Sequence, residues 1–370
     1  PPFLMIRRPP RSTPRQGRRQ RQMCIRDRVI GAGIGGLSAC IRLLAAGREV
    51  VVFDGAGSVG GKMRQVSTAL GPVDSGPTVF TMPSAFESLL DGIGLSLADV
   101  VTTRPMSLLA RHAWEGDASL DLFASRERSA EAIGNFAGAA EARGYLAFCQ
   151  EAGRIYDMLE PAMLTATKPN PLSLAWRARA HGLSALMGLK PFTSLWSALG
   201  RHFRDPRLLQ LFGRYATYCG SSPWQAPATL MLIAHLEQEG VWQIEGGMQS
   251  LADGLADAAS RRGAQFIHGE WVADIERQQG RVTAVIGDRG TRVACDAVVC
   301  NADPEALREG LLGGGAQSAV ASHPQGERSL SALTWAGVAR TQGLPLAFHT
   351  VCFSQDYRRE FQQLFGQQAI

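Results

Sequence analysis

The stretch Val29-Ile30-Gly31-Ala32-Gly33-Ile34-Gly35-Gly36-Leu37 decides the fold, because its glycines follow the pattern G-x-G-x-x-G after an apolar pair. Gly31 permits a tight turn out of a strand, and Gly33 lets the backbone approach a pyrophosphate. Gly36 lets the next helix lie close to the sheet, with the pyrophosphate at the positive N-terminus of that helix. The pattern predicts the opening strand, turn and helix of a dinucleotide-binding βαβ unit.

The residues that follow agree with this interpretation. An apolar stripe at helical spacing ends before Gly47, and a buried strand over residues 50–53 leads directly into Asp54. A carboxylate at that position accepts hydrogen bonds from a ribose diol, which favours FAD or NAD over a 2′-phosphorylated cofactor. The structural alternative is a glycine-rich turn without a ligand, in which Asp54 only caps the strand end. The stripe consists of Ile34, Leu37, Ile41 and Leu44.

A second glycine turn, Gly57-Ser58-Val59-Gly60-Gly61-Lys62, follows Asp54. Its glycines free backbone amides to face an anion, and Lys62 can neutralise a phosphate. We therefore expect Gly61 and Lys62 to lie at the phosphates of the cofactor. The alternative for Lys62 is a solvated surface charge.

The distribution of charge argues against nucleic acid as a partner. The chain of 370 residues carries a formal charge of +5, but residues 1–28 contain nine arginines and one aspartate. The remainder contains 29 basic and 32 acidic residues. The excess of positive charge therefore belongs to residues 1–28 while the body is mildly acidic, and no nucleic-acid partner is predicted.

Residues 1–28 are interpreted as a non-native or disordered tail, since they resemble translated sequencing-adapter read-through joined to a gene fragment. Five prolines argue against the amphipathic helix of an organelle transit peptide. A first strand of this kind needs about five or six residues. Only Val29 and Ile30 stand between Gly31 and the charged Arg26-Asp27-Arg28, so we expect the strand to be cut at Val29.

Familiar metal and nucleophile motifs are missing from the sequence. It has no CxxC pair, no HExxH and no GxSxG, and therefore gives no signal for a zinc site, a dithiol centre or a serine hydrolase. No metal site is predicted. No apolar run approaches 18 residues, so no membrane-spanning helix is predicted either. The six cysteines outside the tail are typical of buried small residues in a reducing compartment.

The chain changes character twice along its length. Its middle carries long apolar helical stripes and few strand signals, and the α/β pattern returns at Gly246-Gly247, which open an amphipathic helix. Short strands are predicted after that helix, including one over residues 330–339. We predict an α/β fold with a discontinuous Rossmann-like cofactor domain and an inserted, mainly helical or mixed substrate domain. The boundaries are residues 29–83 and 236–309 for the first domain, and 84–235 and 310–370 for the second.

Three groups of residues together resemble the flavin-dependent amine oxidase and phytoene desaturase superfamily. The first is the unit from Gly31 to Asp54 with Gly60-Gly61-Lys62. The second is Asp74-Ser75-Gly76-Pro77-Thr78, which is similar to the segment beneath the flavin in carotenoid desaturases. The third consists of Glu245-Gly246-Gly247-Met248, Val272 and Asn301-Ala302.

Within the superfamily, residues 215–223 and 226–230 resemble the hydroxycarotenoid 3,4-desaturases of purple bacteria, also called methoxyneurosporene dehydrogenases. Residues 333–335 and 353–357 fit the same subgroup, whereas Met82-Pro83-Ser84 is closer to phytoene desaturases. Members of the family also carry a glycine-rich segment that closes over the flavin, and no such segment occurs before Ile370. We therefore expect a fragment at both ends.

The resemblance implies FAD as the cofactor and an FAD-dependent desaturase that introduces a C=C bond into a hydroxylated acyclic carotenoid, such as a 1-hydroxycarotenoid, by 3,4-desaturation. A phytoene desaturase, a carotenoid isomerase, an amine oxidase and an inactive fragment are the alternatives. Val272 would meet the adenine with its backbone, or would be an ordinary core residue. The cofactor-binding residues are Gly31, Gly33 and Gly36 for the pyrophosphate, Asp54 for the ribose, Gly61 and Lys62 for the phosphates or the flavin, and Val272 for the adenine.

Desaturation of this kind explains why no catalytic triad or metal cluster occurs, because a flavin accepts the hydride and the protein supplies position and a dry cavity. No catalytic acid or base is named. The expected electron acceptor is oxygen or a quinone.

A substrate that dissolves only in lipid implies a membrane surface as a partner. In residues 172–212, Arg177, Arg179 and Lys190 alternate with bulky apolar residues, which suits a surface that dips into a lipid interface. The alternative is an ordinary amphipathic helix pair. We expect a protein of the bacterial cytoplasm that associates peripherally with the inner (chromatophore) membrane.

Overall fold

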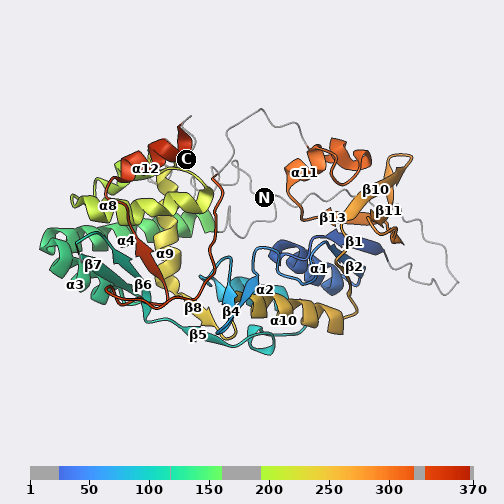
Figure 1. The fold of residues 1–370 in the computed structure, drawn as a ribbon, viewed down its shortest axis with the longest axis horizontal. Helices are drawn as coiled ribbons and strands as arrows, with labels where there is room; N and C mark the ends of the chain where they lie inside the picture. The colour runs from blue at the N-terminus through green and yellow to red at the C-terminus, as the bar shows by residue number, and fades with distance from the viewer. Residues whose placement is uncertain (1–24, 117, 161–192, 321–329, 367–370) are drawn as a thin grey trace. The chain divides into compact units, whose positions relative to one another are not determined.

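Two units make up the chain, and each is built from segments that are separated along the sequence. The computed structural model describes residues 25–116, 118–160, 193–320 and 330–366. Unit 1 is formed by an early and a late part of the chain, and unit 2 by the middle and the end (Figure 1). The segments of unit 1 are Pro1–Arg104, Gln243–Gly326 and Thr334–Val338, and those of unit 2 are Pro105–Trp242, Glu327–Leu333 and Ala339–Ile370.

Unit 1 contains a four-stranded parallel sheet in the order β13-β1-β2-β9. Ile30 of β1 lies opposite Phe53 of β2 and Cys300 of β13, and Asp54 lies opposite His268 of β9. The carboxyl ends of all four strands therefore meet at one edge, which is where open parallel sheets bind ligands. The strands are β1 (Arg26–Ile30), β2 (Glu49–Asp54), β9 (Gln265–His268) and β13 (Ala297–Cys300).

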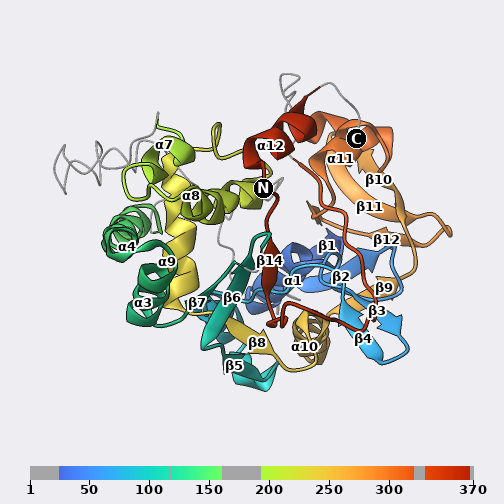
Figure 2. The same cartoon turned by 60° about the vertical axis from the view of Figure 1, so that its left-hand side comes forward.

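Different layers cover the two faces of this sheet. Val29 points toward α1, which runs beside α10 (Figure 1). On the other face, Ile30 and Phe53 belong to a buried cluster with residues of β10 and β11. These two strands and β12 form an antiparallel sheet (Figure 2). Apolar side chains that alternate in and out along β1 and β2 thus fill both layers. These elements are α1 (Ile34–Ala45), α10 (Met248–Arg261), β10 (Val272–Gln278), β11 (Arg281–Gly287) and β12 (Arg292–Ala294).

Residues 330–339 form no strand, so the strand predicted there is wrong. Thr334 instead donates a hydrogen bond from Oγ1 to the carbonyl oxygen of Ser75, and Trp335 is 88% exposed. An apolar run becomes a strand only where a neighbour completes its backbone hydrogen bonds. The other elements of unit 1 are β3 (Gln65–Thr68), β4 (Gly71–Asp74), α2 (Pro83–Asp91), α11 (Pro304–Arg308), and the 3₁₀ helices η1 (Leu97–Asp99) and η5 (Gly314–Ala319), while β5 (Thr103–Pro105) and β8 (Trp242–Ile244) span the unit boundaries.

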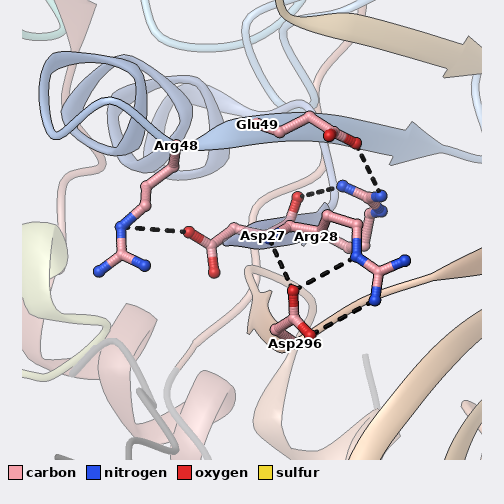
Figure 3. Close-up of polar contacts among 6 residues, drawn as sticks. Asp27, Arg28, Arg48, Glu49 and Asp296 are labelled. Carbon is pink, nitrogen blue, oxygen red and sulfur yellow. Dashed lines mark hydrogen bonds and ion pairs between the residues drawn. The ribbon is translucent and has the colours of Figure 1, made fainter. Parts of the chain in front are cut away.

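The first strand begins at Arg26, three residues earlier than predicted. Asp27 and Arg28 are almost fully buried, although both are ionisable. Figure 3 shows that Arg28 points to Glu49 and Asp27 to Arg48. The Arg48 Nε and Asp27 Oδ2 atoms are 3.9 Å apart, and Arg26 pairs with Asp296. The predicted start at Val29 is wrong, because ladder hydrogen bonds to β2 and β13 involve only the backbone and extend past the apolar residues.

Unit 2 packs helices against a small mixed sheet in the order β14-β6-β7. Its core is rich in aromatic side chains, and Phe212 stacks on Phe203 at 4.9 Å between ring centroids and tilts against Phe148 at 4.7 Å. The elements are β6 (Leu108–Ala113), β7 (Ser119–Phe123), β14 (Thr350–Cys352), α3 (Arg126–Ala137), α4 (Ala139–Leu159), α7 (Leu195–Leu199), α8 (Pro206–Gly213), α9 (Leu232–Glu239), α12 (Tyr357–Phe365), and the 3₁₀ helices η3 (Arg214–Cys219) and η4 (Ala228–Met231).

The region proposed as a lipid-contacting surface is described only from residue 193 onward, so Arg177, Arg179 and Lys190 lie outside the described residues. In the described part, Leu195, Leu199 and Phe203 are buried in the core of unit 2. These apolar residues therefore present no surface to lipid, contrary to the expectation. Among the described residues, every helix is too short or too polar to cross a membrane.

Candidate cofactor-binding site

The turn after β1 has the geometry that its first glycine predicts. Gly31 has φ +92° and donates from its backbone N–H to the carbonyl oxygen of Phe53 at 2.7 Å. The N–H of Asn301, which follows β13, donates to the carbonyl oxygen of Ile30 at 2.8 Å. The turn is thus fixed from the strands on both sides of β1, at the carboxyl edge of the sheet.

Gly36 permits the close packing of the helix that follows. A methyl group at Gly36 would overlap the carbonyl oxygen of Gly31, so no larger residue fits without moving the turn. Gly33 is the N-cap of α1 and offers no side chain to its first backbone N–H groups. These N–H groups and the helix dipole favour a negative group at this end.

The second glycine turn lies against the first. The N–H of Gly60 donates to the carbonyl oxygen of Ala32 at 2.9 Å, and Gly33 and Gly60 form a parallel bridge. A Cβ on Gly61, whose φ is +60°, would lie 3.2 Å from the Cα of Gly33. The structure therefore brings Gly31, Gly33 and Gly61 together, and places Lys62 on the exposed rim beside them.

Asp54 ends β2 beside the glycine turn. Its Oδ2 accepts a hydrogen bond from the N–H of Ala32 at 2.6 Å, and its Oδ1 accepts one from the N–H of Ala56 at 2.8 Å. A carboxylate has about four lone-pair sites. Asp54 can therefore cap the strand and still accept hydrogen bonds from a ribose diol, so the two readings of this residue are compatible.

Val272, predicted at the adenine, is the first residue of β10 and is buried against the same cluster as Phe53. The segment before it runs alongside the end of β2. The N–H of Glu270 donates to the carbonyl oxygen of Asp54 at 3.2 Å, and the N–H of Gly269 donates to that of Ala56 at 2.9 Å. Val272 therefore lies two residues after a segment that is hydrogen-bonded to Asp54.

Asn301 and Asp74 belong to the groups of residues that carry the family resemblance, but neither was predicted as a binding residue. Asn301 reaches over the start of α1: a methyl group on Gly33 would lie 3.5 Å from its Nδ2, and one on Gly35 would lie 3.3 Å from its Cγ. Asp74 accepts a hydrogen bond from the N–H of Met248, the first residue of α10, at 3.0 Å. The motifs at residues 74–78 and 245–248 meet through this contact. The joint presence of these two motifs in the sequence was the only indication that they belong to one site.

The two glycine turns, residues 31–36 and 57–62, together form a cradle that fits a dinucleotide. Its centre is lined by backbone that glycines leave open, a helix N-terminus points at the phosphate position, and a carboxylate stands at the ribose position. Among the described residues, no group of three histidine, cysteine or carboxylate side chains could hold a metal ion. In the described part of unit 1, the geometry supports binding and orientation of a cofactor, and no residue there is assigned as a general acid or base.

Unit 2 contains a buried polar cluster that the sequence analysis did not predict. Glu237 accepts hydrogen bonds from the hydroxyls of Tyr215 at 2.7 Å and Tyr218 at 3.2 Å, and Arg214 lies 3.4 Å away. Burial raises the pKa of Tyr215 well above its usual value. Nearby, burial and then the charge of Arg214 lower the pKa of His112 to about 3. This cluster places two neutral hydroxyl donors and one guanidinium donor around a single carboxylate.

The fold and the two glycine turns define a dinucleotide-binding protein of the Rossmann type. The chain belongs to the flavin containing amine oxidoreductase family, whose model matches residues 34–327. Its cofactor is accordingly FAD, a flavin in dinucleotide form that the cradle accommodates.

Three curated relatives are similar over most of the chain. A hydroxyneurosporene desaturase of Rubrivivax gelatinosus is 46% identical over 92% of this chain, which spans 65% of that protein. Proteins of the same name from Cereibacter sphaeroides and Rhodobacter capsulatus are 43% and 41% identical, over 92% and 90% of this chain. The chain spans 69% and 67% of these two.

A putrescine oxidase bound to putrescine shares the fold. It has a TM-score of 0.50 at 16% identity, over 77% of this chain and 59% of that one. This likeness concerns the fold alone.

Proposed function

We propose that the protein is an FAD-dependent desaturase that introduces a C=C bond into a hydroxylated acyclic carotenoid, in the manner of 1-hydroxycarotenoid 3,4-desaturation. The observation that carries the proposal is the 46%, 43% and 41% identity to three hydroxyneurosporene desaturases. A phytoene dehydrogenase of Streptomyces griseus is 32% identical, which makes phytoene desaturation the second candidate.

In this proposal the residues of unit 1 hold the cofactor. Gly31, Gly33 and Gly36 form the pyrophosphate cradle, and Asp54 accepts hydrogen bonds from the ribose. Gly61 closes the cradle from its other side, Lys62 balances phosphate charge at the rim, and Val272 offers its backbone to the adenine. The bound flavin supplies the capacity to accept a hydride from a carbon that no heteroatom activates.

The proposed division of labour assigns cofactor binding to residues 29–83 and 236–309. Residues 84–235 and 310–370 would take up the substrate. Because a carotenoid dissolves only in lipid, we propose peripheral association with the bacterial inner membrane and electron transfer to a quinone or oxygen. Charge reversal at Arg177, Arg179 and Lys190 is expected to weaken binding to anionic vesicles. Unchanged vesicle binding would remove the membrane part of the proposal.

Product analysis tests the reaction. The purified protein, loaded with FAD, is incubated with a 1-hydroxylated acyclic carotenoid and with its unhydroxylated counterpart, and products are separated by chromatography. Two-hydrogen loss from the hydroxylated substrate alone supports the proposal. Desaturation of the unhydroxylated carotenoid supports the phytoene desaturase instead. An altered double-bond geometry without hydrogen loss indicates an isomerase, oxidation of amines but not carotenoids indicates an amine oxidase, and a flavin-free protein is an inactive fragment.

A further inference from the structure

Trp271 occupies an unusual position for a large aromatic side chain, at the end of the sheet beside Asp54. The residue is 68% exposed although it directly precedes the buried Val272. A methyl group at Gly55 would overlap the indole atoms Cδ2 and Cε2 of Trp271 and lie 2.6 Å from Cε3. The indole therefore lies directly on the backbone of the residue that follows Asp54.

The contact with Gly55 is made by one face of the ring. Cδ2 and Cε2 are the atoms at which the two rings of the indole are fused, and neither carries a hydrogen. An atom nearest to this bond approaches over the face of the bicycle, not at its edge. Since the side chain as a whole is two-thirds exposed, the opposite face of the indole is the one that remains open.

Backbone contacts fix Trp271 in this position. Its N–H donates to Oδ1 of Asp288 at 3.1 Å, and its carbonyl oxygen accepts from the N–H of Asp288 at 2.8 Å. The preceding residue, Glu270, is buried, donates from its N–H to the carbonyl oxygen of Asp54, and accepts from the N–H of Thr291 at 3.2 Å. The backbone that carries the indole is therefore fixed at residues 270 and 271, and the indole itself rests against Gly55.

We propose that the open face of the Trp271 indole is the stacking surface for the purine ring of the bound dinucleotide. The inference rests on the cofactor role proposed for Asp54. A ribose bound by Asp54 would direct its base past the end of β2. Gly55 and the indole of Trp271 that covers it lie at that position. A purine stacks well on an aromatic face. A side chain at Gly55 would overlap the indole and displace it, which explains the glycine at this position.

ADP binding tests this inference, because ADP carries the adenine, ribose and phosphates but no flavin. Calorimetric titration compares the unaltered protein with Trp271→Ala, Gly55→Ala and Trp271→Phe. We expect both alanine variants to bind ADP about tenfold more weakly, as for ~1.4 kcal/mol of lost stacking. Trp271→Phe keeps a flat ring and is expected to retain most of the affinity. Phe348→Ala removes a comparably exposed aromatic ring in unit 2 and is expected to leave ADP binding unchanged.

A second readout separates stacking from a merely structural role. ADP is expected to change the tryptophan emission of the unaltered protein, and Trp271→Phe is expected to lose that change while still binding ADP. If Trp271→Ala and Gly55→Ala fold normally and bind ADP within twofold of the unaltered protein, the inference is wrong. If the unaltered protein binds no ADP, both this inference and the proposed cofactor site are wrong. Absence of desaturation alongside normal ADP binding contradicts only the proposed reaction.

Discussion

Arg28 of β1 and Glu49 of β2 form an ion pair across neighbouring strands, with Nη2 and Oε1 3.2 Å apart (Figure 3). The two partners differ in environment, since the side chain of Arg28 is 3% exposed and that of Glu49 is 52% exposed. The Nε of Arg28 is buried with no hydrogen-bond partner. Burial removes most of the hydration of the Arg28 guanidinium. Its ion pair with Glu49 returns little Coulomb energy, because that carboxylate is half exposed to water.

We therefore predict that Arg28→Leu stabilises the protein. Its free energy of unfolding should rise by about 1–2 kcal/mol, because an apolar side chain replaces a buried charge and its unpaired donor. Glu49→Ala is the matched control and should be destabilising, since it leaves the guanidinium buried without its partner. Urea denaturation measures both changes. A loss of stability in Arg28→Leu would show that the ion pair outweighs its desolvation.

Gly36→Ala should abolish FAD binding and lower the melting temperature. The added methyl group overlaps the carbonyl oxygen of Gly31, so either the turn or the helix must move. Gly57→Ala is the control within the second turn, because a Cβ there meets nothing within 4 Å. Flavin fluorescence and thermal unfolding follow the two variants. Equal FAD affinity in Gly36→Ala and Gly57→Ala would contradict the proposed cradle.

Asp54→Asn should weaken FAD binding about tenfold, as for a loss of ~1.4 kcal/mol. The amide keeps one acceptor oxygen for the N–H of Ala32 but loses the charge that strengthens hydrogen bonds from a ribose diol. Asp99→Asn changes an exposed carboxylate in a capping box and should leave FAD affinity unaltered. Fluorescence titration with FAD distinguishes the two. The ribose role fails if both variants bind equally well.

Tyr215→Phe should destabilise unit 2 by about 1–3 kcal/mol, because it leaves the buried carboxylate of Glu237 without its shortest hydrogen bond. Tyr218→Phe removes the longer bond of a half-exposed residue and should cost less. Chemical denaturation of both variants ranks the two hydroxyls. The reverse order would show that Tyr218 supports the carboxylate.

His112 should make the protein sensitive to acid. The unfolded chain binds a proton near the ordinary pKa of 6.5, whereas the folded protein binds it only near the lowered pKa of about 3. The unfolded state therefore holds more protons between these values, and stability present above pH 6.5 is lost as pH falls, by at most ~1.4 kcal/mol per pH unit. His112→Gln should remove this slope. Urea denaturation from pH 7 to pH 4.5 measures it, and parallel curves for both proteins would contradict the assignment.

The order of strand, glycine turn, helix and strand from β1 to β2 could be predicted from the sequence alone. Gly31 has a positive φ and Gly36 a close backbone contact that favour glycine, and Asp54 ends a strand whose preceding residues 50–53 are apolar. The α/β fold was predictable for the same reason: turn, helix and strand signals here act over a few residues. The family followed from three such groups of residues, and the comparisons confirm it.

Sequence by itself determined which segments are strand, helix and glycine turn around residues 29–62, because those preferences are set by near neighbours. The tertiary structure alone decided that Arg28 is buried, that Asn301 covers the start of α1, and that Trp271 rests on Gly55. Each of these joins residues more than 20 positions apart or depends on which strands complete a backbone ladder. Such contacts form only when the whole unit packs, so no local pattern in the chain announces them.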